Sequence, residues 1–192
     1  MITILNFGSS KTPLIAEMVK TCKEKCVVVK WDKFKRADLK KSSGIIFSGS
    51  PAMFTEVNHQ PYIKKFSFIK DGKIPVLGIC FGHQLLGILH DAKIFRGDEI
   101  RSKNKINVLK QDILFNGLFP ETEMKEDHTE GISLPPSFIH LATSSSYTNE
   151  GMRHPVLPLW GVQFHPEVSG RNGKKLIENF ILFCMQARED LV

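Results

Sequence analysis

Short apolar runs alternate with stretches of helical periodicity along most of this chain. β-rich runs occupy residues 2–7, 26–31, 44–48, 74–80 and 158–164. Apolar residues recur at helical spacing within residues 12–22, 61–70, 82–90 and 172–186. This alternation is typical of a mostly parallel sheet with helices on both faces. We therefore predict an α/β fold with a mostly parallel central sheet flanked by helices.

Residues 92–141 have a different character, with short β-rich stretches, turns and a local excess of acidic residues between 121 and 130. We expect this segment to pack as a small antiparallel or irregular extension of the same unit. No internal repeat, low-complexity tract or linker divides the sequence. The simplest prediction is a single domain over residues 1–192.

The composition is that of an ordinary globular protein, with 42% hydrophobic and 24% charged residues. No window approaches the roughly 18 uninterrupted apolar residues that a membrane-spanning helix requires. The N-terminus has no basic stretch before its apolar run, so residues 2–7 are predicted to be a strand rather than a signal peptide. We expect a cytoplasmic protein that does not engage a membrane.

The formal net charge of +6 arises from one basic window. Residues 20–41 contain nine Lys or Arg residues and three acidic residues, which accounts for the whole excess. The window carries no nucleic-acid-binding signature, so no nucleic-acid partner is predicted. We interpret it as a solvated face, with docking to a partner protein as the alternative.

Three of the four cysteines, Cys22, Cys26 and Cys184, lie in apolar periodic stretches, where cysteine usually acts as a small buried hydrophobe. No two cysteines have the two-residue spacing of a zinc site, so we predict free thiols and no metal. Cys80, the fourth, stands in a different setting.

Cys80 lies where an apolar strand is predicted to run directly into a helix. Gly78 and Gly82 flank it, two residues away on either side. This is the layout of a nucleophile elbow, a sharp strand-to-helix turn that presents one side chain in a strained, exposed position. Glycine is needed at both flanks because a Cβ atom there would collide with neighbouring backbone. A core cysteine at a strand end is the alternative that this motif alone leaves open.

The start of the helix also provides chemistry for Cys80. A helix N-terminus carries about half a positive charge, which favours thiolate over thiol. The Phe81 N–H can help to hold a developing oxyanion. Gln84 lies at i+4 from the cysteine, and helical side chains tilt toward the N-terminus, so its amide can reach the same pocket. His83 falls inside the new helix and is interpreted as a packing or surface residue.

A second motif supplies the partners that a nucleophilic cysteine needs. A predicted strand delivers His165 at its carboxyl end, where open α/β sheets place their ligands. Pro166 keeps His165 out of the helical region, and in extended backbone His165 and Glu167 would share one side. The carboxylate can then orient the imidazole, which completes a set of nucleophile, base and orienting acid.

These motifs resemble those of the class I glutamine amidotransferases, and the resemblance covers nearly the whole chain. Residues 78–84 look like the nucleophile motif of that family, and residues 164–167 look like its base motif. Further stretches are similar to the GMP synthase branch of the family, namely residues 4–9, 44–51, 95–99 and 164–168. The resemblance implies a flavodoxin-like α/β fold and a glutaminase activity.

The resemblance also implies roles for residues outside the triad. In the turn after the third strand, Gly49 and Ser50 would supply oxyanion-hole N–H groups beside Phe81, with Ser50 in place of the usual glycine. Residues 127–130 correspond to the segment that brackets the bound glutamine. The implied substrate-binding residues are Gln84, His128 and Thr129. No metal or organic cofactor is implied for this reaction.

The predicted reaction is attack of Cys80 on the glutamine carboxamide, which gives a γ-glutamyl thioester and ammonia. His165 protonates the departing nitrogen and later activates water, while Glu167 orients His165. A separate ATP-dependent synthetase subunit is the expected partner, because residues 1–192 leave no room for a synthetase domain. Two alternatives stay open: a stand-alone cysteine hydrolase acting on γ-glutamyl or peptide bonds, and a non-catalytic regulatory module of the same fold.

Overall fold

The core of the protein is a large mixed sheet, seen in a computed structural model that describes residues 1–72 and 74–189. In that part of the chain the sheet has nine strands, in the order β2-β1-β3-β4-β11-β10-β9-β6-β7. The first five strands in this order run parallel to one another, and each corresponds to one of the predicted β-rich runs. They are β1 (Ile2–Asn6), β2 (Cys26–Lys30), β3 (Gly44–Phe47), β4 (Val76–Ile79) and β11 (Leu159–Val162). The predicted mostly parallel α/β fold is confirmed.

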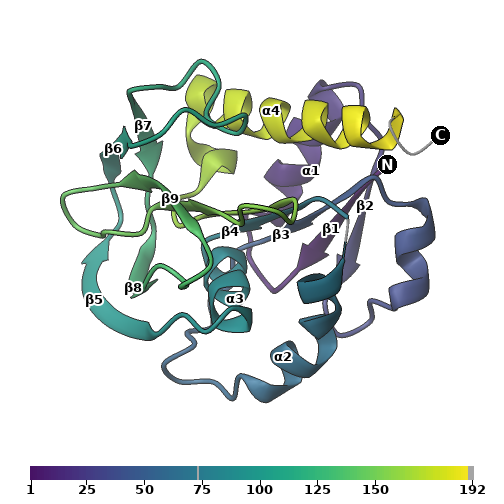
Figure 1. Ribbon diagram of the computed structural model, residues 1–192, viewed down its shortest axis with the longest axis horizontal. Coiled ribbons are helices and arrows are strands. Elements are labelled where there is room, and N and C mark those ends of the chain that lie inside the picture. Colours follow the sequence, from purple (N-terminus) through teal and green to yellow (C-terminus); the bar gives the residue numbers. More distant parts are fainter. Residues whose placement is uncertain (73, 190–192) are drawn as a thin grey trace.

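Helices cover both faces of this sheet (Figure 1). The helices are α1 (Thr12–Thr21), α2 (Gln60–Phe66), α3 (Phe81–Leu89) and α4 (Gly170–Glu189). The apolar faces of α1 and α4 pack on one side of the sheet, and those of α2 and α3 pack on the other. Short 3-10 segments occupy Arg36–Lys41, Ser67–Asp71 and Pro166–Val168. The predicted helix over 61–70 is therefore α-helical only as far as Phe66.

The predicted antiparallel extension is present, and most of it continues the main sheet. Its strands in that sheet are β6 (Lys103–Val108), β7 (Glu121–Lys125), β9 (Ile139–Thr143) and β10 (Gly151–Arg153). A separate two-stranded ribbon consists of β5 (Ile94–Ile100) and β8 (His128–Ile132). This ribbon lies beside α3 and brings residues 127–130 to the same end of the sheet as Cys80 (Figure 1).

The basic window surrounds the edge strand β2. All nine of its Lys and Arg side chains are exposed, as both a solvated face and a docking surface would require. Cys184 is buried as predicted, but Cys22 and Cys26 are only half-buried. The prediction was wrong for these two because Cys22 sits at the end of α1 and Cys26 lies on the sheet edge. No helix in the described residues is long and apolar enough to cross a membrane.

Candidate active site

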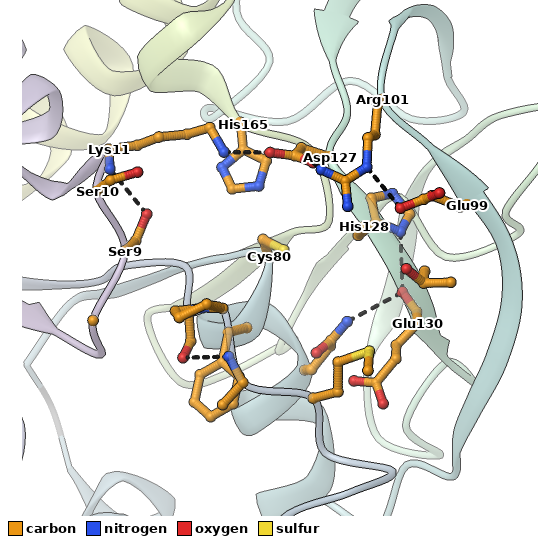
Figure 2. Close-up of a pocket in the computed structure, with 18 of the residues that line it drawn as sticks. Ser9, Ser10, Lys11, Cys80, Glu99, Arg101, Asp127, His128, Glu130 and His165 are labelled. Carbon is orange, nitrogen blue, oxygen red and sulfur yellow. Dashed lines mark hydrogen bonds and ion pairs between the residues drawn. The ribbon is translucent and has the colours of Figure 1, made fainter.

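Cys80 forms a strained turn between β4 and α3. Its backbone has φ +50° and ψ −104°, a conformation that side-chain-bearing residues rarely adopt. Two hydrogen bonds fix this turn: the Cys80 N–H donates to the Val162 carbonyl at 2.9 Å, and the Cys80 carbonyl accepts the Gln84 N–H at 3.0 Å. The sulfur faces the open centre of the pocket (Figure 2), so the predicted elbow is present. Cys80 is nevertheless buried, with 6% of its surface exposed, so the expectation of an exposed side chain was wrong.

The glycines that flank Cys80 are sterically required. A Cβ atom on Gly78 would lie 2.4 Å from the Gly82 carbonyl oxygen. A Cβ atom on Gly82 would lie 2.5 Å from Phe47 Cβ and 2.6 Å from the Phe47 carbonyl oxygen. All three distances are far below van der Waals contact, so only glycine lets β4 turn into α3 this sharply. The predicted need for two glycines is confirmed.

His165 and Glu167 are joined as predicted, although by a different backbone geometry. The Nδ1 atom of His165 lies 2.7 Å from Oε1 of Glu167, and both side chains are buried. The backbone of His165 is non-helical, as the following Pro166 requires, with φ −107° and ψ 89°. Residues 166–168 then form a 3-10 turn. The expectation of extended backbone was wrong, and it is this turn that brings the carboxylate to the imidazole.

The charge state of His165 is set by its two neighbours. Burial disfavours the imidazolium form, but the neighbouring Cys80 sulfur and the Glu167 carboxylate outweigh it and raise the pKa of His165 to about 10. Near neutral pH the ring is therefore a cation. His83 packs inside the core against Gly161, and burial lowers its pKa to about 3, so it stays neutral.

Gly49 and Ser50 lie in the turn that follows β3. A Cβ atom on Gly49 would come within 3.1 Å of His165 Cε1 and 3.8 Å of Cys80 Cβ, so glycine leaves room for the imidazole. Gly49 itself does not line the pocket, whereas Ser50 and Phe81 do. The Ser50 side chain turns back into its own loop, where Oγ donates to the Phe7 carbonyl at 2.8 Å and accepts the Ala52 N–H at 3.1 Å.

The backbone at Ser50 is unstrained, because the residue does not have a positive φ. Serine therefore fits a position where the family usually has glycine. Within the described residues, the N–H groups of Ser50 and Phe81 donate to no other backbone group. Both are free to bind an oxyanion formed next to Cys80.

The pocket over Cys80 has a volume of about 650 Å³ and is built from the loops after β1, β3 and β4, together with β5 and β8. This is the edge where parallel strands place their ligands, next to the point where the strand order reverses between β1 and β3. The predicted residues Gln84, His128, Thr129 and His165 all contribute to its lining.

Charged groups of both signs surround the pocket mouth (Figure 2). Asp127 lies 2.5 Å from Lys11 Nζ and 3.4 Å from Arg101, which also contacts Glu99 at 2.6 Å. Partial burial tends to raise the pKa of Asp127, but Lys11, His165 and Arg101 lower it overall. Asp127 is therefore ionised at neutral pH. Sequence reasoning did not identify Lys11 or Arg101, because no local motif marks them.

His128 lines the pocket, but its ring is held by hydrogen bonds within the protein. Its Nδ1 lies 3.0 Å from the Glu130 carbonyl oxygen, and its Nε2 lies 2.6 Å from Glu126 Oε2. Both ring nitrogens are thus engaged within the protein, so any contact of His128 with a substrate would involve its backbone. The Glu130 carboxylate accepts the N–H groups of Phe54 and Thr55 at 2.8 and 2.7 Å, which ties the loop after β3 to β8.

Next to the part of the pocket lining formed by β8 lies a group of residues with atoms that could bind a metal ion. Glu126, His128 and Glu150 place one such atom each within 4.8 Å of the others, and all three are buried. Burial and the nearby Glu126 raise the pKa of Glu150 to about 9, so its carboxyl is protonated at neutral pH. Because Glu126 and His128 already hydrogen-bond to each other, we interpret this group as a hydrogen-bonded support for the pocket wall.

Gln163 is a further residue beside Cys80 that sequence reasoning missed. Its side chain is fully buried, and its Nε2 lies 3.6 Å from the Cys80 sulfur. The sequence offered a signal for it, since Gln163 lies two residues before His165 and directly follows β11.

Comparison with known proteins identifies the class to which this chain belongs. The model of the class I glutamine amidotransferase family matches residues 3–184. The chain therefore belongs to that family and is an enzyme of that class.

Relatives narrow the similarity to one branch of the family. The chain is 37% identical over 145 residues to a glutamine-hydrolyzing GMP synthase subunit of Pyrococcus abyssi. The aligned region covers 74% of this chain and 76% of that protein. The subunit of the same name from Methanosarcina mazei is 35% identical over 144 residues, covering 73% of each chain.

Solved structures agree with this placement. A protein of the GMP synthase subunit type from Thermoplasma acidophilum superposes with a TM-score of 0.90 and 26% identity, covering 99% of this chain and 96% of that one. A glutamine amidotransferase from Thermotoga maritima has a TM-score of 0.74, covering 97% of this chain and 84% of that one. At 20% identity, the second match bears on the fold alone.

Proposed function

We propose that Cys80, His165 and Glu167 form a catalytic triad that hydrolyses the side-chain amide of glutamine to glutamate and ammonia. The observation that carries the proposal is the placement of a strained cysteine at a helix N-terminus beside a buried His–Glu pair held at 2.7 Å. The relatives named as glutamine-hydrolysing subunits support the choice of substrate.

The first half-reaction forms a thioester. The Cys80 thiolate attacks the carboxamide carbon of glutamine, and the N–H groups of Phe81 and Ser50 bind the resulting oxyanion. His165 then gives a proton to the nitrogen, the C–N bond breaks, and ammonia leaves. The high pKa of His165 ensures that this proton is present at neutral pH.

The second half-reaction releases glutamate. His165, now neutral, takes a proton from water as the water attacks the thioester carbonyl. The C–S bond breaks with its electron pair on sulfur, which restores the thiolate beside the imidazolium. Glu167 holds the ring through Nδ1 in both halves, so that Nε2 carries the transferred proton.

The pocket also suits the other end of an amino acid. Lys11 and Arg101 can attract an α-carboxylate, and Asp127 and Glu99 can attract an α-ammonium group. Gln84 donates its side-chain N–H groups to the Glu130 carbonyl and to Gln163, so its Oε1 is the atom left to accept from the ammonium. Thr129 and the backbone of His128 complete the substrate contacts.

We further propose that the ammonia passes to a separate ATP-dependent amidating subunit of the GMP synthase type. The support is that the relatives are named as one subunit of a GMP synthase and match about three-quarters of this chain. A cysteine hydrolase that works alone on γ-glutamyl compounds is the competing possibility.

The direct test measures ammonia release from glutamine, with and without a GMP synthetase subunit, by wild type and Cys80→Ala. Cys26→Ala is the matched control, since Cys26 is a half-buried thiol on the far edge of the sheet. We expect Cys80→Ala to lose activity and Cys26→Ala to retain it. Acid quenching with labelled glutamine should trap label on wild type but not on Cys80→Ala.

The possible outcomes separate the alternatives. Activity retained by Cys80→Ala would disprove the triad and the thioester. If the wild-type activity does not change when the synthetase is added, and larger γ-glutamyl substrates are also turned over, the free hydrolase is favoured.

A further inference from the structure

The mechanism above leaves the amide of Gln163 without a role. Gln163 directly follows β11, and its backbone N–H donates to the Glu150 carbonyl at 3.0 Å, which fixes its place in the sheet. Its side chain is completely buried, and Nε2 lies 3.6 Å from the Cys80 sulfur, within the range of a hydrogen bond to sulfur. The question is which end of this amide faces the nucleophile.

Hydrogen-bond chemistry settles the orientation of the amide. The Glu130 carbonyl oxygen can only accept, so the Gln84 atom that lies 3.1 Å from it must be the nitrogen. The same nitrogen lies 3.2 Å from the Gln163 side chain, which must therefore turn its oxygen toward Gln84. The other end of the Gln163 amide, its NH₂ group, is left facing Cys80.

The Glu130 carbonyl, which fixes the orientation of Gln84, is itself held in place by hydrogen bonds. Because the Glu130 carbonyl is an acceptor, the His128 Nδ1 that lies 3.0 Å away must carry a hydrogen. The other ring nitrogen of His128 bonds Glu126 Oε2 at 2.6 Å, and Asn104 donates to the second oxygen of Glu126 at 2.7 Å. The half-buried Asn104 on β6, the buried Glu126 between β7 and β8, and the buried His128 at the start of β8 thus hold the Glu130 carbonyl in place.

We propose that Gln163 is a catalytic residue that donates its side-chain N–H to the Cys80 sulfur, and that Gln84 positions it. This inference rests on the proposed role of Cys80 as the nucleophile. A donated hydrogen bond favours the charged thiolate over the thiol, which increases the reactive fraction of Cys80. It also stabilises the sulfur as the leaving group when the thioester C–S bond breaks.

The test is the rate of Cys80 alkylation by iodoacetamide as a function of pH, measured on the free protein. The informative variants are Gln163→Met, which keeps the volume but has no N–H, and Gln163→Glu, which turns an anionic oxygen toward the sulfur. Gln186→Met is the matched control, since Gln186 is exposed on α4. The kcat and KM for glutamine are measured in parallel.

We expect Gln163→Met to move the alkylation midpoint up by about 1 pH unit and to lower kcat about 10-fold with little change in KM. Gln163→Glu should move the midpoint further, and Gln186→Met should leave it unchanged. A folded Gln163→Met protein with the wild-type midpoint and kcat would overturn the proposal.

A second variant covers the case in which Gln163→Met does not fold. Gln84→Met frees the Gln163 amide to rotate, so it should also move the alkylation midpoint upward. An unmoved midpoint would contradict the proposal that Gln84 positions Gln163. Failure of the proposed function is recognised by another measurement. In that case Cys80→Ala would still hydrolyse glutamine, whatever the alkylation profiles of the Gln163 and Gln84 variants show.

Discussion

Removal of the charge on Glu167 provides a quantitative test of the triad. Glu167→Gln keeps the size of the side chain and an oxygen that can accept from Nδ1 of His165, 2.7 Å away. It removes the anion that helps to raise the pKa of His165 to about 10. An adjacent opposite charge of this kind typically shifts a pKa by about 1 to 3 pH units.

The expected magnitude follows from that shift. The pKa of His165 should fall from about 10 to between about 7 and 9, because the imidazolium loses about 1.4 to 4 kcal/mol of stabilisation. His165 must be protonated to release ammonia, so the alkaline limb of the pH profile should move down by the same amount.

The assay is kcat/KM for glutamine hydrolysis across pH 5 to 11 (roughly the span of both limbs). Glu178→Gln is the control, since Glu178 lies on the surface of α4 and pairs only with Lys174 among the described residues. An alkaline limb at the same pH in wild type and Glu167→Gln would refute the assigned role of Glu167.

The same pKa shift predicts a pH dependence of folding. A pKa raised in the folded state adds stability that is complete below the unfolded value of about 6.5 and is lost as pH rises through about 10. The free energy of unfolding from urea titrations should therefore fall over this range in wild type, and over a narrower range in Glu167→Gln.

Three further substitutions test contacts seen in the structure. Gly82→Ala places a Cβ atom 2.5 Å from Phe47 Cβ and should lower the free energy of unfolding by about 3 kcal/mol, so an unchanged urea midpoint would contradict the steric argument. Gly49→Ala places a Cβ atom 3.1 Å from the His165 ring and should lower kcat by about 10-fold or more while the melting temperature changes little, which steady-state kinetics and thermal unfolding will decide. Glu130→Gln weakens the bonds to the Phe54 and Thr55 N–H groups and should cost about 1 to 3 kcal/mol and raise KM; a wild-type KM would show that this loop does not shape the pocket.

The sequence by itself determined the parts of the site that depend on local geometry. Hydrophobic periodicity located the parallel strands and their helices. The spacing of Gly78, Cys80 and Gly82 identified the elbow, because steric exclusion of Cβ atoms acts over a few residues and leaves a readable pattern. His165 and Glu167 were likewise found together, although the 3-10 turn between them was not expected.

Only the tertiary structure decided which distant groups meet and which way their side chains face. Lys11 reaches Asp127 across 116 residues of sequence, and Gln163 meets Cys80 across 83. The ring of His128 turns inward because it hydrogen-bonds there to the Glu130 carbonyl and the Glu126 carboxylate. No motif around residue 128 predicts this orientation. Such contacts depend on strand order and on the packing of separate elements, and local sequence does not encode them because each partner is selected by the fold as a whole.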